Sequence, residues 1–399
     1  MTDCKTNGLI FAKSDDGTFY SVRADEISIT EAHVPSQYNG LPVSALDKGA
    51  FCGYTQLKSV TLPDSIEAIP QEAFKGCTSL SDIKLPAHCR RIEESSFLDC
   101  RALKSISLPI SLYTIESNAF SGCESLSEIR IPENTHIGSW AFNGCKSLKR
   151  ISIPNTMGTI ARGMLAGCTA LEEIRLPCSV TDICEWAFSG CTSLKIAEMS
   201  SVTAVRDWAF NECTSLTEIT LPKATTELGN HAFDGCTSLR KVTAEGSIKS
   251  IGSYAFADCR MLSDINFGQY EPPLMKTEYD PISGKSITYE PRISIYPIID
   301  VKAFLNCTAL KSISIPEAIK GIFDFAFADC TALEAVSIPK SVVLIRVGAF
   351  LGCKSLGVIH YDGTLEEWKH VERINAWKGI ASDLTVVCKD GSMTVMCTP

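Results

Sequence analysis

The chain has 399 residues, of which 45% are hydrophobic and 21% charged, and its formal net charge is −9. This composition is typical of a folded protein and excludes a disordered chain. The longest apolar runs are far shorter than the roughly 20 residues that cross a bilayer, so no membrane insertion is expected. The acidic balance comes without a basic run that could neutralise phosphates, so nucleic acid is not an expected partner.

The N-terminal segment is expected to cap the repeats that follow it. Residues Met1 to Lys5 are polar and show no apolar segment with a cleavage site. No secretory signal is therefore visible, and the sequence alone favours a cytoplasmic location. Gly8 to Ala24, centred on Asp16 and Gly17, predicts a β-hairpin. We assign residues 1–39 to an N-terminal cap made of this hairpin and a first strand.

From residue 40 onward a motif of 22 or 23 residues recurs. The unit is A-F-x-G-C-x-x-L-x-x-I-x-L-P, as in Ala73 to Pro86. Its anchor residue occurs thirteen times, at Phe51, Phe74, Phe97, Phe120, Phe142, Leu165, Phe188, Phe210, Phe233, Phe256, Phe304, Phe327 and Phe350. Such a chain grows by adding turns and does not need a larger core, so its length does not imply several globular domains.

The repeat predicts one short strand and one left-handed residue in each turn. Leu80 to Leu85 alternates apolar and polar residues, as a strand with one buried face does, and successive strands should form a parallel sheet. A proline follows nine of these strands and ends the ladder. Two positions after the anchor, Gly, Asp or Asn stands in every turn except one. These residues tolerate a left-handed backbone, which is least secure at Glu212.

Twelve of the 19 cysteines occupy a single repeat position, at Cys77, Cys100, Cys123, Cys145, Cys168, Cys191, Cys213, Cys236, Cys259, Cys307, Cys330 and Cys353. Stacked strands place such side chains about 4.8 Å apart and parallel, whereas disulfide-bonded cysteines turn toward each other. Single cysteines at this spacing also lack the C-x-x-C pairing of zinc sites. We therefore expect buried thiols and a reducing environment, with no metal.

The period breaks once, between Phe256 and Phe304, where about 25 residues are extra. The segment 269–297 is rich in Tyr and Pro and predicts either a projecting hairpin or a degenerate repeat. Tyr279 and Tyr289 are its candidate contact residues, because insertions in repeat proteins often lie on a binding face. The alternative is a surface excursion without function. The repeats, which cover 40–268, resume over 298–360.

The C-terminal segment 361–399 is expected to form a helix-and-hairpin cap. Thr364 and Glu367 match a capping box at the start of a helix that would carry Trp368, Val371, Ile374 and Trp377. Leu384 to Val387 and Met393 to Met396 flank Asp390 and Gly391 and predict a final hairpin.

Candidate contacts lie where equivalent positions of the repeat vary. On the outward face of the strands, Lys84, Arg130 and Arg175 occupy alternate turns and could meet an acidic partner, or could simply be a solvated face. A second candidate line lies two residues before the anchor, where the middle turns carry Trp140, Trp186, Trp208, His231 and Tyr254. These aromatic residues are either a recognition stripe for protein or glycan, or rings that cover the edge of the next turn.

The sequence contains no recognisable catalytic or metal-binding arrangement. Its six histidines do not form an H-E-x-x-H or H-x-H pattern, and no G-x-S-x-G elbow occurs. Gly284, Lys285 and Ser286 resemble the end of a phosphate-binding loop, but the earlier glycine is replaced by Tyr279. We therefore predict no catalytic residue, no metal and no cofactor.

The unit A-F-x-G-C-x-S-L-x-x-I-x-[LI]-P, seen in Ala73 to Pro86 and Ala119 to Pro132, resembles the treponemal, BspA-like class of bacterial leucine-rich repeats over roughly residues 40–360. Tyr361 to Trp368 is similar to the C-terminal end of such proteins. The resemblance implies a β-rich solenoid, a right-handed superhelix of stacked parallel strands with small caps. It also implies a non-catalytic, monomeric, protein-binding protein at the cell surface or secreted, with an adhesin-like role toward host or neighbouring cells. The alternatives are an intracellular interaction scaffold and, more remotely, a carbohydrate-binding module.

Overall fold

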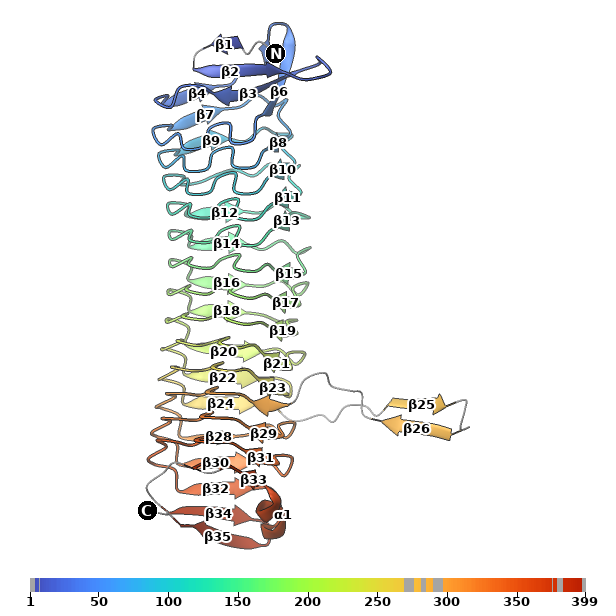
Figure 1. Cartoon of the computed structure of the whole chain (residues 1–399), viewed down its shortest axis with the longest axis vertical. Helices are drawn as coiled ribbons and strands as arrows, with labels where there is room; N and C mark the ends of the chain where they lie inside the picture. The colour runs from blue at the N-terminus through green and yellow to red at the C-terminus, as the bar shows by residue number, and fades with distance from the viewer. Residues whose placement is uncertain are drawn as a thin grey trace. The chain divides into compact units, whose positions relative to one another are not determined.

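The computed structural model describes residues 4–6, 8–268, 276–280, 285–289, 297–374, 376–378 and 383–396. Two compact units divide the chain: the first comprises Met1–Ile219 and Ala232–Leu239, and the second Thr220–His231 and Arg240–Pro399. Each unit is a solenoid of short parallel strands, which confirms the predicted fold class (Figure 1). The described residues contain no helix that is long and apolar enough to cross a membrane.

The first unit begins with a five-stranded sheet. Its strands are β1 (Cys4–Thr6), β2 (Leu9–Lys13), β3 (Tyr20–Ala24), β5 (Gln37–Tyr38) and β6 (Leu41–Leu46), in the order β1-β2-β3-β6-β5. The hairpin expected around Gly17 is present, because Leu9 pairs with Ala24 across antiparallel β2 and β3. Phe11 of this sheet stacks on Tyr38, with ring centroids 4.1 Å apart. The sheet therefore extends beyond residue 39, as far as Leu46.

The strand predicted in each repeat forms the first of two rows, which we call the first row. The prediction was wrong in one turn, because residues 103–109 form no strand. In the first unit it contains β4 (Glu31–His33), β7 (Ser59–Thr61), β9 (Asp82–Lys84), β12 (Glu128–Arg130), β14 (Arg150–Ser152), β16 (Glu173–Arg175) and β18 (Ile196–Glu198). In the second unit it contains β22 (Lys241–Ala244), β24 (Asp264–Phe267), β28 (Ser312–Ser314), β30 (Ala335–Ile338), β32 (Val358–Tyr361) and β34 (Leu384–Cys388), while β20 (Glu218–Leu221) falls at the boundary of the units. These strands are shorter than predicted: Leu80 and Leu85 are buried but lie just outside β9.

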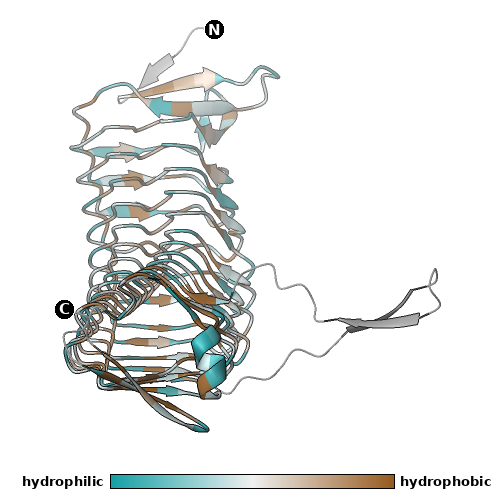
Figure 2. Ribbon diagram, turned by 60° about the horizontal axis from the view of Figure 1, so that its bottom comes forward, coloured by the Kyte–Doolittle hydropathy of each residue, from teal (hydrophilic) through white to brown (hydrophobic). Residues whose placement is uncertain are grey.

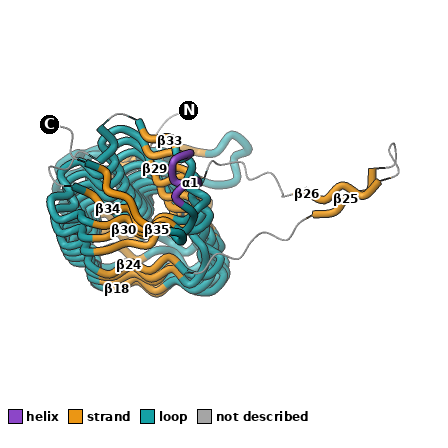
Figure 3. Tube along the Cα trace, turned by 90° about the horizontal axis from the view of Figure 1, so that it is seen from below, coloured by secondary structure: helices purple, strands orange, loops and turns teal. Residues whose placement is uncertain are grey.

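A second row of two-residue strands precedes the anchors. In the first unit it contains β8 (Ala68–Ile69), β10 (Arg91–Ile92), β11 (Thr114–Ile115), β13 (His136–Ile137), β15 (Thr159–Ile160), β17 (Asp182–Ile183) and β19 (Ala204–Val205). In the second unit it contains β21 (Glu227–Leu228), β23 (Ser250–Ile251), β27 (Ile298–Ile299), β29 (Gly321–Ile322), β31 (Leu344–Ile345) and β33 (Glu372–Arg373). Figure 3 shows strands on two sides of the turns with loops between them. The sequence did not predict this row, because two residues are too few to show alternation.

The core of each unit is a column of stacked anchor rings beside a column of thiols. Ring centroids of successive anchors lie 5.0 to 5.6 Å apart. Leu165 interrupts the ring column between Phe142 and Phe188. The twelve cysteines that share one repeat position, which we call the thiol line, are fully buried and form no disulfide, as expected. Figure 2 shows that apolar residues recur along the strands.

The thiols are also hydrogen-bond donors. In eleven of them the Sγ donates to the carbonyl oxygen of the anchor one turn earlier, at 2.9 to 3.3 Å. A cysteine at this position therefore fills space as a small apolar residue and also bonds the preceding turn.

In the second unit the residues between Phe256 and Phe304 add no rung to the core. The rings of these two anchors stack directly at 5.2 Å, and Ile251 of β23 pairs with Ile299 of β27. Within the interruption, β25 (Lys276–Asp280) pairs antiparallel with β26 (Lys285–Tyr289). The remaining residues of 269–296 lie outside the described part of the chain.

The second unit ends in a helix and a hairpin. The helix α1 (Leu365–His370) has the expected capping box, in which Thr364 and Glu367 bond each other's backbone N–H groups. The prediction that this helix reaches Trp377 was wrong. Val371 has an extended backbone, and the following strand β33 pairs with β31, so the chain rejoins the sheet after six helical residues. The final strands β34 and β35 (Gly391–Val395) pair antiparallel.

Candidate binding surface

The residues two positions before the anchors, which we call the outer line, all have a left-handed backbone. Their φ angles lie between 55° and 65°. The line consists of Gly49, Glu72, Ser95, Asn118, Trp140, Gly163, Trp186, Trp208, His231, Tyr254, Lys302, Phe325 and Gly348. An L-residue with a bulky side chain is disfavoured in this conformation by about 1–2 kcal/mol. The varied side chains of this line are visible in the sequence, whereas its backbone conformation is not.

The positions two residues after the anchors are left-handed as well, as predicted. Their φ angles lie between 54° and 79°, and Glu212, the least secure case, has a φ of 57°. Each turn therefore has a left-handed residue on either side of the anchor, and Asn134, with a φ of 62°, is a further one between Phe120 and Phe142.

Three tryptophans of the outer line lie together in the first unit. The rings of Trp186 and Trp208 are stacked, with centroids 5.0 Å apart and an angle of 10° between their planes. The Trp140 ring lies 6.1 Å from that of Trp186 and covers Gly163, since a Cβ on this glycine would overlap it. The guanidinium of Arg162 lies over the Trp186 ring, 4.6 Å from its centroid. We call Trp140, Trp186 and Trp208 the tryptophan stripe.

The stripe is half-buried, and this fits both interpretations made from the sequence. All three tryptophans have intermediate exposure. Arg162 and Trp208 both contact the Trp186 ring and cover part of it. Sequence reasoning missed Arg162 and Gly163. The signal was available for Gly163, which occupies the outer line between two tryptophans and is the residue that gives Trp140 its room.

The other predicted aromatic residues belong to the second unit. His231 and Tyr254 stack with centroids 4.6 Å apart, and the Lys302 ammonium lies 5.2 Å from the Tyr254 ring centroid. Tyr279 lies in β25 opposite Ser286, and Tyr289 lies in β26 opposite Lys276.

The three predicted cations lie on strands of the first row. Lys84 is in β9, Arg130 in β12 and Arg175 in β16, and all three are exposed. Arg175 forms ion pairs with Glu198 at 2.8 Å and with Glu173 at 3.5 Å. Around Arg175, acidic side chains therefore share this face with the cation.

The buried thiols and several acidic side chains have roles in holding the turns together. Burial raises the pKa of Cys77 and of Cys191 to about 12, which leaves both thiols protonated and unreactive at neutral pH.

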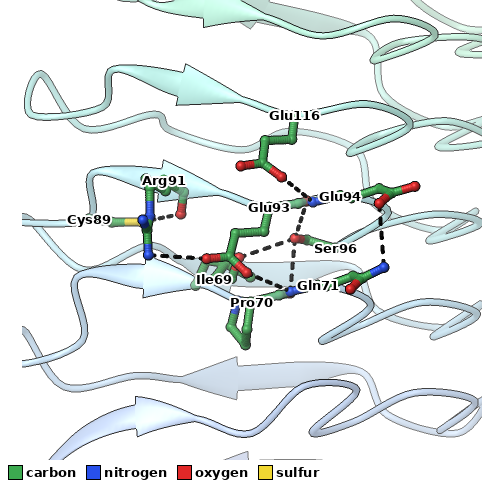
Figure 4. A network of polar contacts seen from close by, with 9 residues as sticks. All are labelled: Ile69, Pro70, Gln71, Cys89, Arg91, Glu93, Glu94, Ser96 and Glu116. Carbon is green, nitrogen blue, oxygen red and sulfur yellow. Dashed lines mark hydrogen bonds and ion pairs between the residues drawn. The ribbon is translucent and has the colours of Figure 1, made fainter.

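Glu93 accepts a hydrogen bond from the Gln71 N–H at 3.1 Å, and Glu116 accepts one from the Glu94 N–H at 3.1 Å (Figure 4). These carboxylates satisfy the main chain of the preceding turn. The described residues contain no cluster of three side chains suited to hold a metal.

The same network contains a polar residue of the core. Ser96 stands where most turns have alanine and is fully buried. Its hydroxyl reaches the carbonyl oxygens of Glu93, Ile69 and Pro70 at 2.5, 3.2 and 3.1 Å (Figure 4). Serine is therefore tolerated at this buried position because its hydroxyl has hydrogen-bond partners.

Comparison with known proteins gives the family. The BspA type leucine rich repeat region matches residues 18–149, 115–203, 196–271 and 282–370. A leucine-rich repeat protein of Bacteroides ovatus is 26% identical over 93% of this chain and 97% of its own, with a TM-score of 0.71. A leucine rich cell surface protein of Faecalibacterium prausnitzii is 27% identical over 93% of this chain and 98% of its own, with a TM-score of 0.56. No curated protein matches the chain. The chain belongs to the family of BspA type leucine-rich repeat proteins.

Proposed function

We propose that the protein is a non-catalytic, adhesin-like binding protein of the cell surface, and that the tryptophan stripe recognises its protein partner. The single observation that carries the proposal is the stripe itself. Tryptophan rings occupy three left-handed positions of the outer line, although Gly49, Ser95 and Asn118 show that small residues also serve there. Such strain at adjacent sites suggests a functional demand, because folding alone would favour the smaller residues.

The stacking of the rings favours a protein partner over a glycan. A sugar ring binds on the open face of an aromatic side chain, whereas the faces of Trp186 are in contact with Arg162 and Trp208. Half-buried tryptophan edges with an arginine beside them have the composition of hot spots in protein interfaces.

The comparisons support the coarser part of the proposal. Leucine-rich repeat proteins generally bind protein partners, and their families are generally non-enzymatic. The relative from Faecalibacterium prausnitzii, which aligns over 93% of this chain, is described as a cell surface protein. That description supports a surface location, and an intracellular scaffold is the alternative.

Protease treatment of intact source cells tests the location. Selective loss of this protein, with a cytoplasmic protein preserved, is the expected result. Survival of the protein until the cells are lysed would overturn the surface assignment and favour the intracellular scaffold.

A binding assay with purified protein tests the stripe. The double variant Trp186→Gly with Trp208→Gly should lose saturable binding to cultured epithelial cells or to neighbouring bacteria, and protease treatment of the target cells should abolish wild-type binding. The matched control is Phe325→Gly, at an outer-line position of the second unit where the Phe325 ring similarly covers Gly348. Unchanged binding by the double variant would rule out the stripe, and binding that is lost only after glycosidase treatment would indicate a glycan.

A further inference from the structure

The second row of strands in the first unit contains a gap. Strands β8, β10, β11 and β13 form one sheet, and β15, β17 and β19 belong to another. Within the described residues, no ladder joins β13 (His136–Ile137) to β15 (Thr159–Ile160). The neighbouring strands show what is missing. The Gly138 N–H donates to the Ile115 carbonyl at 2.8 Å, and the Cys184 N–H donates to the Ile160 carbonyl at 3.0 Å.

The corresponding donor and acceptor at the gap are the Ala161 N–H and the Ile137 carbonyl, and no backbone hydrogen bond joins them. The turns remain connected beside the gap, because the Trp140 N–H donates to the Arg162 carbonyl at 2.8 Å. The gap is therefore local to the two strands, because the turns are bonded on the other side of it as well, where the Asn134 N–H donates to the Thr156 hydroxyl.

A cavity of about 470 Å³ lies at this gap, lined by main chain and side chains of residues 134–137, 156–159 and 161. We call it the slot. Two hydroxyl groups of its lining are already bonded within the protein. The buried Thr135 hydroxyl donates to the Leu112 carbonyl at 3.0 Å, and the hydroxyl of the exposed Thr156 accepts from the Asn134 N–H at 2.9 Å. The volume falls within the usual range for ligand sites of about 300–1,000 Å³.

The main-chain groups at the slot determine what it can bind. A ligand that fits must donate one hydrogen bond to a carbonyl and accept one from an N–H, at the spacing of a β-ladder. A peptide group has this chemistry, and an extended peptide presents it repeatedly. Ile137 and Met157 add an apolar contribution to the lining.

We propose that the slot between β13 and β15 binds a short extended peptide segment by completing the interrupted ladder. The segment donates an N–H to the Ile137 carbonyl and accepts from the Ala161 N–H. Recognition rests on the peptide backbone, so it tolerates different side-chain sequences. This proposal does not rest on the tryptophan stripe, and the two can fail separately, because the slot is tested with a synthetic probe.

The probe is the capped tripeptide acetyl-Val-Thr-Val-amide, whose β-branched residues favour an extended backbone. Its comparison probe carries an N-methyl group on all three residues and so lacks those donors. Titration of the full chain, followed by saturation-transfer NMR, should show saturable binding of the first probe and at least about tenfold weaker binding of the second.

Two glycine variants locate the binding. Gly158 lines the slot, its φ is not left-handed, and a Cβ added there meets nothing within 4 Å, so Gly158→Leu should fold and block the slot. Gly357 has the same properties in the second unit and is not among the lining residues, so Gly357→Leu is the matched control. We expect a loss of at least about tenfold in affinity for the first variant and no change for the second.

Three results would overturn the proposal: no saturable binding by the first probe, equal binding by the N-methylated probe, or equal binding by the folded Gly158→Leu variant. The first would mean that the slot holds only water. The second would mean that side chains and not the backbone are recognised, and the third would place the peptide elsewhere.

Discussion

The thiol line and the outer line repeat with the same period but differ in what they permit. The thiol line holds cysteine in twelve turns, each fully buried and, in eleven, bonded to the turn before. The outer line imposes one left-handed conformation but accepts residues from glycine to tryptophan. A side chain that is packed on all sides can be only one residue type. A left-handed backbone without such packing only adds a free-energy penalty for residues other than glycine. The outer line can therefore carry residues that are selected for binding and not for packing.

The position two residues after each anchor separates these two effects. It has the same left-handed conformation as the outer line, yet it holds only glycine or a polar residue. Successive turns are crowded at some of these positions: a Cβ on Gly122 would lie 2.5 Å from the Asp99 Oδ1, whereas one on Gly76 would make only an ordinary contact of 3.7 Å with the Gly53 Cα. In the crowded turns, contact with the preceding turn adds to the cost of the left-handed conformation.

Alkaline pH should have the largest effect, because the whole thiol line responds together. Burial raises the pKa of Cys77 to about 12 and also raises the pKa of Cys123. In the unfolded chain a cysteine thiol has a pKa of about 8.5. The folded pKa lies above the unfolded one, so the contribution of the thiols to stability is complete below pH about 8.5 and is lost as pH rises toward about 12. Each buried thiol should lower the free energy of unfolding by about 1.4 kcal/mol per pH unit in this window.

Urea unfolding at about pH 7 and about pH 8.5 measures this dependence, because the summed loss over twelve thiols would exceed the total stability of the fold at higher pH. Cys123→Val removes one thiol from the line and should make the dependence shallower. The control is Cys178→Val, because Cys178 is exposed. Equal slopes for Cys123→Val and the wild type would show that the buried thiols do not control alkaline stability.

Crowding at the left-handed glycines should have the next largest effect. Gly53 and Gly122 have φ angles of 79° and 73°, but a Cβ on Gly53 meets nothing within 4 Å, whereas one on Gly122 would lie 2.5 Å from Asp99 Oδ1 and 3.4 Å from its Cα. Gly53→Ala should destabilise by about 1 kcal/mol through backbone strain alone, and Gly122→Ala by about 2 kcal/mol through strain and displacement of Asp99. Urea midpoints of both variants check the order; if Gly53→Ala were the more damaging, crowding would not be the cause.

Strain at the tryptophan stripe should be visible as a smaller difference between two variants. Trp186→Ala and Trp186→Gly both lose the stacking with Trp208, but only glycine adopts a φ of 56° without strain. The glycine variant should therefore be more stable to urea than the alanine variant by about 1 kcal/mol. An alanine variant of equal or greater stability would contradict the strain on which the proposed function depends.

How much of this could be predicted from sequence depends on whether a feature repeats. The anchors, the buried thiols and the strand at Ile83 followed from a pattern seen in thirteen internal copies. The helix end at His370 did not, because Val371 and Trp377 have helical spacing although the chain returns to the sheet between them. The slot was equally invisible, since its main-chain groups carry no residue-specific signal. In the stripe, the tryptophans could be found, but their stacking on Arg162 and over Gly163 depends on neighbouring turns.

Removal of an exposed ion pair should have the smallest effect. Arg175 and Glu198 lie 2.8 Å apart, but their side chains are 61% and 53% exposed. Water and salt screen such a pair, so Arg175→Ala should change the free energy of unfolding by less than about 0.5 kcal/mol, and Lys84→Ala by no more. Urea unfolding at low and high salt checks this, and a loss above about 1 kcal/mol would mean that the first-row charges act as a network. If Arg175→Ala instead leaves stability unchanged but weakens cell binding, the recognition surface extends from the tryptophan stripe onto the strand face.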